Sequence, residues 1–168
     1  MLTIKFSYQK FIYYFLWILI LAALQGTVAP AISIFRVTPN FLVIFIVCAA
    51  ILSRNPFEPA VAGFILGFLF DFMVGHRIGV GMLLMMYAGV FNGLMFKRLL
   101  TGKYFGILPV VFGASFLFAL MYFVLNFGFG QFGYAFLFVM LPEATYNTLL
   151  CLPLYWLAKK TYVRAEYS

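Results

Sequence analysis

AGFILGFLFDFMVGHRIGVGMLL, residues 62–84, contains one carboxylate, Asp71, in a stretch that is otherwise almost wholly apolar and rich in glycine. Small residues and Asp71 recur at every fourth position, in the order Gly63, Gly67, Asp71, Gly75 and Gly79. On a helix, positions four apart form one slowly drifting stripe, and a stripe of small residues lets a second helix approach closely. We therefore predict that Asp71 faces a neighbouring helix and not lipid.

The next apolar run offers a matching surface for that stripe. It contains a pair of small residues four apart, Gly89 and Gly93, with Asn92 beside them. Pairs of this small-xxx-small type are typical of tightly packed membrane helices. The sequence thus predicts that residues 57–75 and 79–96 form a tight helical hairpin.

The composition of the chain indicates whether water or lipid surrounds it. Of 168 residues, 66% are hydrophobic and 9% are charged, and the mean hydropathy is +1.09. A water-soluble globule could not carry such a composition without large exposed apolar patches. In lipid every backbone polar group must pair within a helix or a closed barrel, and the unbroken apolar runs here are long enough for helices that cross a core of about 30 Å. We predict an all-α integral membrane protein.

Prolines, glycines and charges divide residues 1–168, which we take as one polytopic domain, into six predicted spans. They cover residues 11–28, 39–53, 57–75, 79–96, 104–125 and 134–158. The second is too short to cross a core of about 30 Å upright, so we expect it to lie off-centre or to distort the bilayer. Pro142-Glu143 is typical of a helix start, which predicts a separate short element over residues 134–141 and a kink at Pro153 in the helix that follows.

The basic residues predict the orientation of the spans. With six spans and a cytoplasmic N-terminus, only Arg36 and Arg77 lie outside. The cytoplasmic segments then hold Lys5, Lys10, Arg54, Lys97, Arg98, Lys103, Lys159, Lys160 and Arg164. Such a bias favours cytoplasmic termini at both ends. The net charge of +7 then reflects topology and contact with anionic lipid headgroups, and no nucleic-acid partner is expected. Ala29-Pro30-Ala31 resembles a signal-peptide cleavage site, but we expect this long, aromatic first segment to be retained.

Catalytic and metal-binding motifs are missing from the sequence. The two cysteines, Cys48 and Cys151, fall inside predicted spans, where a thiol packs as a small apolar group. His76 is the sole histidine, and no spacing typical of metal ligands occurs. The sequence shows no pattern that pairs a catalytic nucleophile with a general base. We expect no metal, no cofactor and no enzymatic activity.

The remaining acids predict a polar cluster near the outer membrane surface. Asp71 lies about one turn inside the outer end of its helix, and Glu143 enters the last span from the same side with Asn147 one turn below it. Because charged groups at membrane depth usually pair, Arg36 and Arg77 are the candidate counter-charges for Asp71. A purely structural role for Asp71, fixing helix packing, is an equally open interpretation, and Asn147 is expected to bond between helices.

Three stretches carry a resemblance to a known family. They are RVTPNFLVIFIV (36–47), the opening stretch 62–84, and LPEATYNTLLCLPLYWLAKK (141–160). They resemble the MreD family of rod shape-determining membrane proteins, which has a P-[DN]-x-L helix start, a central GxxxGxxxD with a glycine-containing turn, and a last helix with a polar residue before a proline. Here these are Pro39-Asn40-Phe41-Leu42, the stripe of Asp71, and Asn147 with Pro153. The resemblance covers residues 36–160.

The resemblance implies a non-enzymatic scaffold of the bacterial cell-elongation machinery, in the cytoplasmic membrane. Its implied partners are the bitopic protein MreC, a RodA-type glycan polymerase with its penicillin-binding transpeptidase, and the filament protein MreB. The implied fold resembles the six-helix substrate-binding S component of energy-coupling-factor transporters. That fold leaves an alternative function open, vitamin capture by such a component, which an outer cluster of Asp71, Glu143 and Asn147 would suit. The short loop before Tyr134 argues against it, since it is small for a lid.

Overall fold

The computed structural model describes residues 8–34, 37–53, 55, 57–74, 77–95, 106–128 and 132–167. In this part of the chain the structure is helical apart from short connections and one isolated bridge between Ile34 and Val37. The predicted all-α class is therefore confirmed. The elements are α1 (Tyr8–Ala23), η1 (Leu24–Val28), α2 (Ala29–Ala31), α3 (Phe41–Leu52), α4 (Phe57–Val74), α5 (Val80–Met95), α6 (Ile107–Phe127), α7 (Phe132–Ala135), η3 (Phe136–Met140) and α8 (Leu141–Tyr167).

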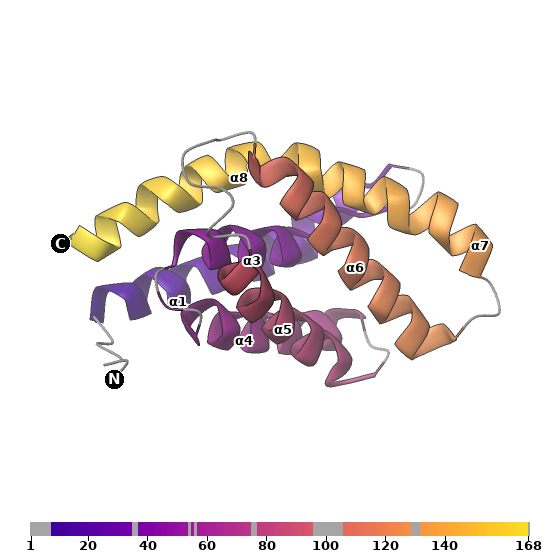
Figure 1. Ribbon diagram of the computed structural model, residues 1–168, viewed down its shortest axis with the longest axis horizontal. Coiled ribbons are helices and arrows are strands. Elements are labelled where there is room, and N and C mark those ends of the chain that lie inside the picture. Colours follow the sequence, from indigo (N-terminus) through magenta and orange to yellow (C-terminus); the bar gives the residue numbers. More distant parts are fainter. Residues whose placement is uncertain are drawn as a thin grey trace.

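Six helical segments correspond to the six predicted spans. Four of them are long and apolar enough to cross a membrane, namely Lys10–Ala31, Phe57–Val74, Ile107–Phe127 and Gly133–Tyr162. The other two, Phe41–Leu52 and Val80–Leu94, are shorter apolar helices. Figure 1 shows α8 along the length of the molecule, with α6 crossing beside it and α4 and α5 lying together.

The ends of two spans differ from the sequence prediction. The first helical segment runs on through the π-helical η1 and past Pro30 to Ala31, where we predicted an end at residue 28. In the last segment the residues before 141 do not form a separate short helix, because α7, η3 and α8 follow one another without a break. A proline at position 142 lacks an amide hydrogen and crowds the preceding turn, and the wider π-helical turn of η3 accommodates both effects.

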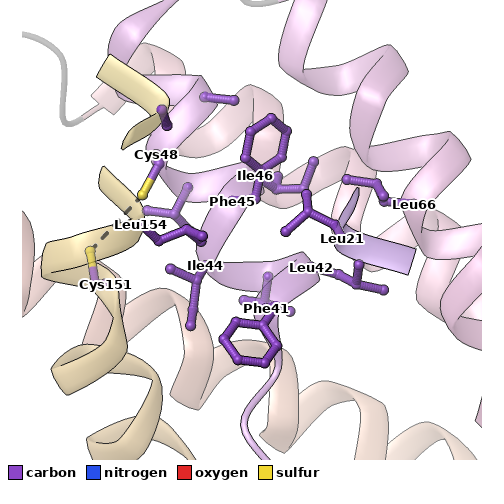
Figure 2. Packing of buried hydrophobic residues seen from close by; sticks show 14 of the residues in the cluster. Leu21, Phe41, Leu42, Ile44, Phe45, Ile46, Cys48, Leu66, Cys151 and Leu154 are labelled. Atoms are coloured by element: carbon purple, nitrogen blue, oxygen red, sulfur yellow. Dashed lines mark hydrogen bonds between the residues drawn. The ribbon is translucent and has the colours of Figure 1, made fainter. Parts of the chain in front are cut away.

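The short helix α3 lies at the centre of the molecule. All its residues from Phe41 to Ala50 are buried, and α1, α4, α5, α6 and α8 pack against it. Figure 2 shows Leu21, Leu66 and Leu154 around it, with Cys48 pointing at Cys151 at an Sγ–Sγ distance of 4.0 Å. Because protein surrounds α3, its length is not set by the thickness of the lipid, which removes the reason to expect that it distorts the bilayer.

The start of α1 and the end of α8 lie at the same end of the molecule (Figure 1). There Lys10 Nζ is 3.1 Å from Glu58 Oε1, at the start of α4, and 3.4 Å from the Tyr162 hydroxyl on α8. Glu58 Oε2 also accepts a hydrogen bond from Ser53 Oγ at 3.0 Å, just after α3. These contacts join the ends of four helices into one polar cluster.

Candidate functional site

The helices α4 and α5 pack more extensively against each other than any other described pair. A methyl group added at Gly63 would lie 2.5 Å from the carbonyl oxygen of Met85, and one added at Gly67 would lie 2.5 Å from that of Gly81. Real side-chain carbons do not approach backbone atoms so closely, so the two backbones are in direct contact at both positions. We call this contact the α4–α5 seam. It runs from Pro59 to Asp71 on α4, and from Gly79, just before α5, to Gly89 on α5.

The seam keeps a constant antiparallel register. Gly67 meets Gly81, Gly63 meets Met85, and a methyl group at Gly89 would lie 2.6 Å from the carbonyl oxygen of Pro59. Each step of four residues along α4 is thus matched by four residues in the opposite direction along α5. This register follows from the glycine spacing, because only residues without a Cβ allow backbones to touch. Gly93 is buried one turn further along α5, and Gly75 lies outside the described residues.

Asp71 closes the seam at the start of α5. Its side chain has no exposed surface, Oδ1 accepts a hydrogen bond from Gly81 N at 2.8 Å, and Oδ2 accepts from Gly79 N at 2.8 Å and from Met82 N at 3.3 Å. The first amides of a helix have no partner within the helix and carry the positive end of its dipole. The carboxylate satisfies three of them, so its negative charge is compensated by the backbone of α5.

The partners of Asp71 differ from those expected from the sequence. Arg77 Nη1 donates to the carbonyl oxygen of Leu125 at 3.1 Å, near the end of α6, where a cation interacts favourably with the helix dipole. Among the described residues no ion pair reaches Asp71, and Arg36 lies outside them. The reason is local, because the free amides of α5 follow Asp71 by only eight to eleven residues and supply the positive charge without a long side chain to order.

Two glycines make the turn before α5 possible. Gly79 has φ +108°, a conformation that other residues rarely adopt, and it donates its amide to Asp71. A methyl group at Gly81 would press directly on the Asp71 carboxylate. The stripe of every fourth residue includes Gly79 but does not predict Gly81. The available signal was its position two residues after Gly79, at the start of the next apolar run.

Asn147 belongs to a second polar group, at the start of α3. Its Oδ1 accepts a hydrogen bond from Asn40 N at 2.8 Å, while the side chain of Asn40 caps α3 by accepting from Val43 N at 3.2 Å. The side chain of Gln25, in η1, bridges this start, since Oε1 accepts from Phe41 N at 2.9 Å. The sequence predicts an interhelical bond for Asn147 but gives no such signal for Gln25, a lone amide near the end of an apolar run.

Glu143 lies half-buried in the first turn of α8, one turn before Asn147. Among the described residues, no hydrogen bond or ion pair joins Glu143, Asn147 and Asp71 to one another. These polar residues therefore fall into two groups, the α4–α5 seam and the cap of α3. Both groups bond to the backbone at helix starts, an arrangement that fixes helices in place.

The arrangement holds helices together and offers an apolar exterior. In the described part of the chain, no three His, Cys, Asp or Glu side chains are grouped so that they could hold a metal ion. Large apolar side chains such as Phe72, Ile78 and Leu149 are exposed on the outside. Exposed surface of this kind meets lipid or the transmembrane helices of other proteins.

Comparison with known proteins identifies the family. The chain matches the family of the rod shape-determining protein MreD over residues 8–164, almost its whole length. Neither a curated protein nor a solved structure gives a match. The family match includes the first helical segment, which the residue motifs from 36 to 160 left out. With this match added to the stripe of Asp71 and the six apolar helical segments, the chain belongs to the MreD family of rod shape-determining membrane proteins.

Proposed function

We propose that the chain is a non-enzymatic scaffold of the bacterial cell-elongation machinery. The match to the MreD family over residues 8–164 carries this proposal, because the family takes part in rod-shape determination within the MreBCD system. The described structure supports it in two ways. Asp71 and Asn147 bond to the backbone at helix starts, and the apolar exterior suits packing against other membrane helices.

We propose an MreC-type bitopic protein as the first partner. A RodA-type glycan polymerase with its penicillin-binding transpeptidase, and MreB, are the further partners that we propose. In lipid there is no hydrophobic force between helices, so such contacts depend on close packing and on interhelical hydrogen bonds. The α4–α5 seam supplies the rigidity for this role, because Gly63, Gly67 and Asp71 leave the hairpin no room to slide.

We further propose that both termini lie in the cytoplasm and that the protein lies in the bacterial cytoplasmic membrane. The contacts of Lys10 with Glu58 and Tyr162 support a common side for the start of α1 and the end of α8. The excess of basic residues in the corresponding segments supports the cytoplasm as that side. The likeness to the S-component fold stays a prediction.

Complementation tests the proposal. The chain is expressed in a rod-shaped bacterium whose own MreD has been deleted, and cell shape, membrane abundance and recovery of MreC after crosslinking in native membranes are measured. We expect rods and a crosslinked MreC adduct. Round cells despite normal membrane abundance, or no MreC adduct when rods are restored, would contradict the scaffold or its partner respectively. Vitamin capture gains no support from the family match, and we do not propose it.

A further inference from the structure

An open groove lies beside the seam, where α5 faces α6. It has a volume of about 520 Å³ and is formed between α5 and α6. We call it the α5–α6 groove. Its rim consists of large apolar side chains such as Tyr87 and Leu117, and its lining includes the small residues Ala88, Gly113 and Ala114. A methyl group added at Gly113 would meet none of the described residues within 4 Å, so they leave this part of the groove open.

Two side chains with polar groups line this apolar groove, the exposed Tyr87 and the buried Asn92. Asn92 supplies the buried one. It is 3% exposed, and its Nδ2 donates to the carbonyl oxygen of Ala88 at 2.7 Å, one turn earlier in α5. Its Oδ1 is buried and has no hydrogen-bond partner among the described residues. An unpaired carbonyl oxygen in an apolar environment costs free energy, because it has lost its bonds to water without replacement.

The chemistry of the groove selects its occupant. A lipid acyl chain would fill the apolar space but has no hydrogen to donate to Asn92 Oδ1. A helix with a hydroxyl or amide side chain supplies both the apolar surface and the donor, and the small lining residues allow it to approach closely. The partial negative charge of Oδ1 is thus complementary to a donor hydrogen on such a helix.

We propose that the α5–α6 groove docks a transmembrane helix of another protein, whose Ser, Thr, Asn or Gln side chain donates a hydrogen bond to Asn92 Oδ1. This inference rests on the proposed scaffold function and adds the surface and the chemistry of one partner. Asn92 lies three residues before the last residue of α5, Met95, so the donor sits about 5 Å from that end of the helix. Binding requires the Asn92 side chain to turn toward the groove, because its Oδ1 is covered in the structure.

A peptide in vesicles tests the proposal with the full-length chain. The probe is a lysine-flanked polyleucine transmembrane peptide with one serine a turn from each end, so that either insertion direction presents a donor at the right depth. The reference is the same peptide without serine. Energy transfer to a C-terminal fluorescent protein on the chain is measured in phosphatidylcholine–phosphatidylglycerol vesicles. We expect the serine peptide to bind about threefold to tenfold more tightly, the gain typical of one interhelical hydrogen bond in a membrane.

Three variants assign that preference to the groove. Asn92→Leu removes the acceptor and should remove the preference for serine. Gly113→Leu fills the groove and should abolish binding of both peptides. Ser115→Ala is the matched control, because Ser115 also has a buried hydroxyl without a partner in the described structure but does not line the groove. It should leave the preference unchanged.

Several results would overturn the proposal. They are equal binding of the two peptides, binding of neither, or a serine preference that survives in Asn92→Leu. Energy transfer between two differently labelled copies of the chain that falls in Asn92→Leu would assign the groove to self-association. Failure here is distinct from failure of the scaffold function. A chain that restores rods but shows no serine preference contradicts the groove alone, whereas a chain that never restores rods contradicts the scaffold.

Discussion

The buried polar groups on the two sides of α5 differ in their hydrogen bonding. Toward α4, backbones touch at Gly67 and Gly81, and the Asp71 carboxylate has three amide donors. Toward α6, a groove of about 520 Å³ stays open and the Oδ1 of Asn92 has no partner among the described residues. A closed contact with satisfied polar groups is what a structural hairpin needs. An open contact with an unsatisfied group suits a surface that is completed by another molecule.

The largest expected effect is a difference in stability between substitutions at two glycines, Gly67 in the seam and Gly113 in the groove. Gly67→Leu forces a side chain into the backbone of α5, where overpacking costs about 1–3 kcal/mol and more when backbone must move. Gly113→Leu fills open space and should leave the fold intact. We expect Gly67→Leu to be lost from the membrane fraction and Gly113→Leu to retain normal abundance and detergent unfolding temperature. Equal abundance of the two variants would contradict the closed seam.

The second effect tests what compensates the charge of Asp71. Asp71→Asn keeps the size of the side chain but turns an amide toward backbone donors and loses charge-assisted bonds. It should lower the free energy of unfolding by about 3 kcal/mol, since hydrogen bonds to charged groups contribute about 1.5–3 kcal/mol each. Arg77→Gln is the control and should cost about 0.5 kcal/mol or less, because Arg77 is exposed and does not contact the carboxylate.

Thermal unfolding in detergent measures both changes. A loss in Arg77→Gln as large as that in Asp71→Asn would restore the arginine as the counter-charge. Cell shape adds a second distinction. If Asp71→Asn is normally abundant and stable but cells become round, the residue serves the function directly, and the purely structural interpretation fails.

The turn before α5 gives a smaller effect. Gly79→Ala places a Cβ on a residue with φ +108°, at a cost of about 1–3 kcal/mol for a strained backbone. Gly133→Ala, in the helical α7 where a methyl group meets nothing within 4 Å, should be neutral or raise stability by about 0.5–1 kcal/mol. Opposite signs in the unfolding temperature are expected, and a loss in both variants would show that any added methyl group is harmful.

The residues that the sequence placed correctly are those whose position follows from spacing along one helix. The stripe of Gly63, Gly67 and Asp71 predicts a close helix contact, because periodicity four is a property of a single helix. The partner of Asp71 could not be predicted in this way. Charge suggested an arginine, but the amides that hold the carboxylate belong to a backbone turn, whose direction depends on the conformation of Gly79.

The cap of α3 shows the same limit. Asn147 on α8 bonds to the start of α3, as expected of a bond between helices, but the identity of its partner Asn40, 107 positions away, does not follow from spacing along one helix. Gln25 reaches Phe41 only because η1 and α3 end up side by side in three dimensions. Likewise, the length of α3 suggests a poor fit to a lipid core, because a sequence does not say which helix is surrounded by others.

The smallest expected effect is the change in unfolding temperature of Asn92→Leu. Its sign tests whether the side of α5 toward α6 is open while the side toward α4 is closed. Replacing an unsatisfied buried group by an apolar one of similar shape is nearly neutral or stabilising, whereas removing one partner of a satisfied pair costs about 1–3 kcal/mol. Asn92→Leu should therefore keep or slightly raise the unfolding temperature of the isolated chain, as should Ser115→Ala on α6. If Asn92→Leu instead destabilises the chain as strongly as Asp71→Asn, Asn92 has a partner inside the fold, and the contrast between a closed side and an open side of α5 does not hold.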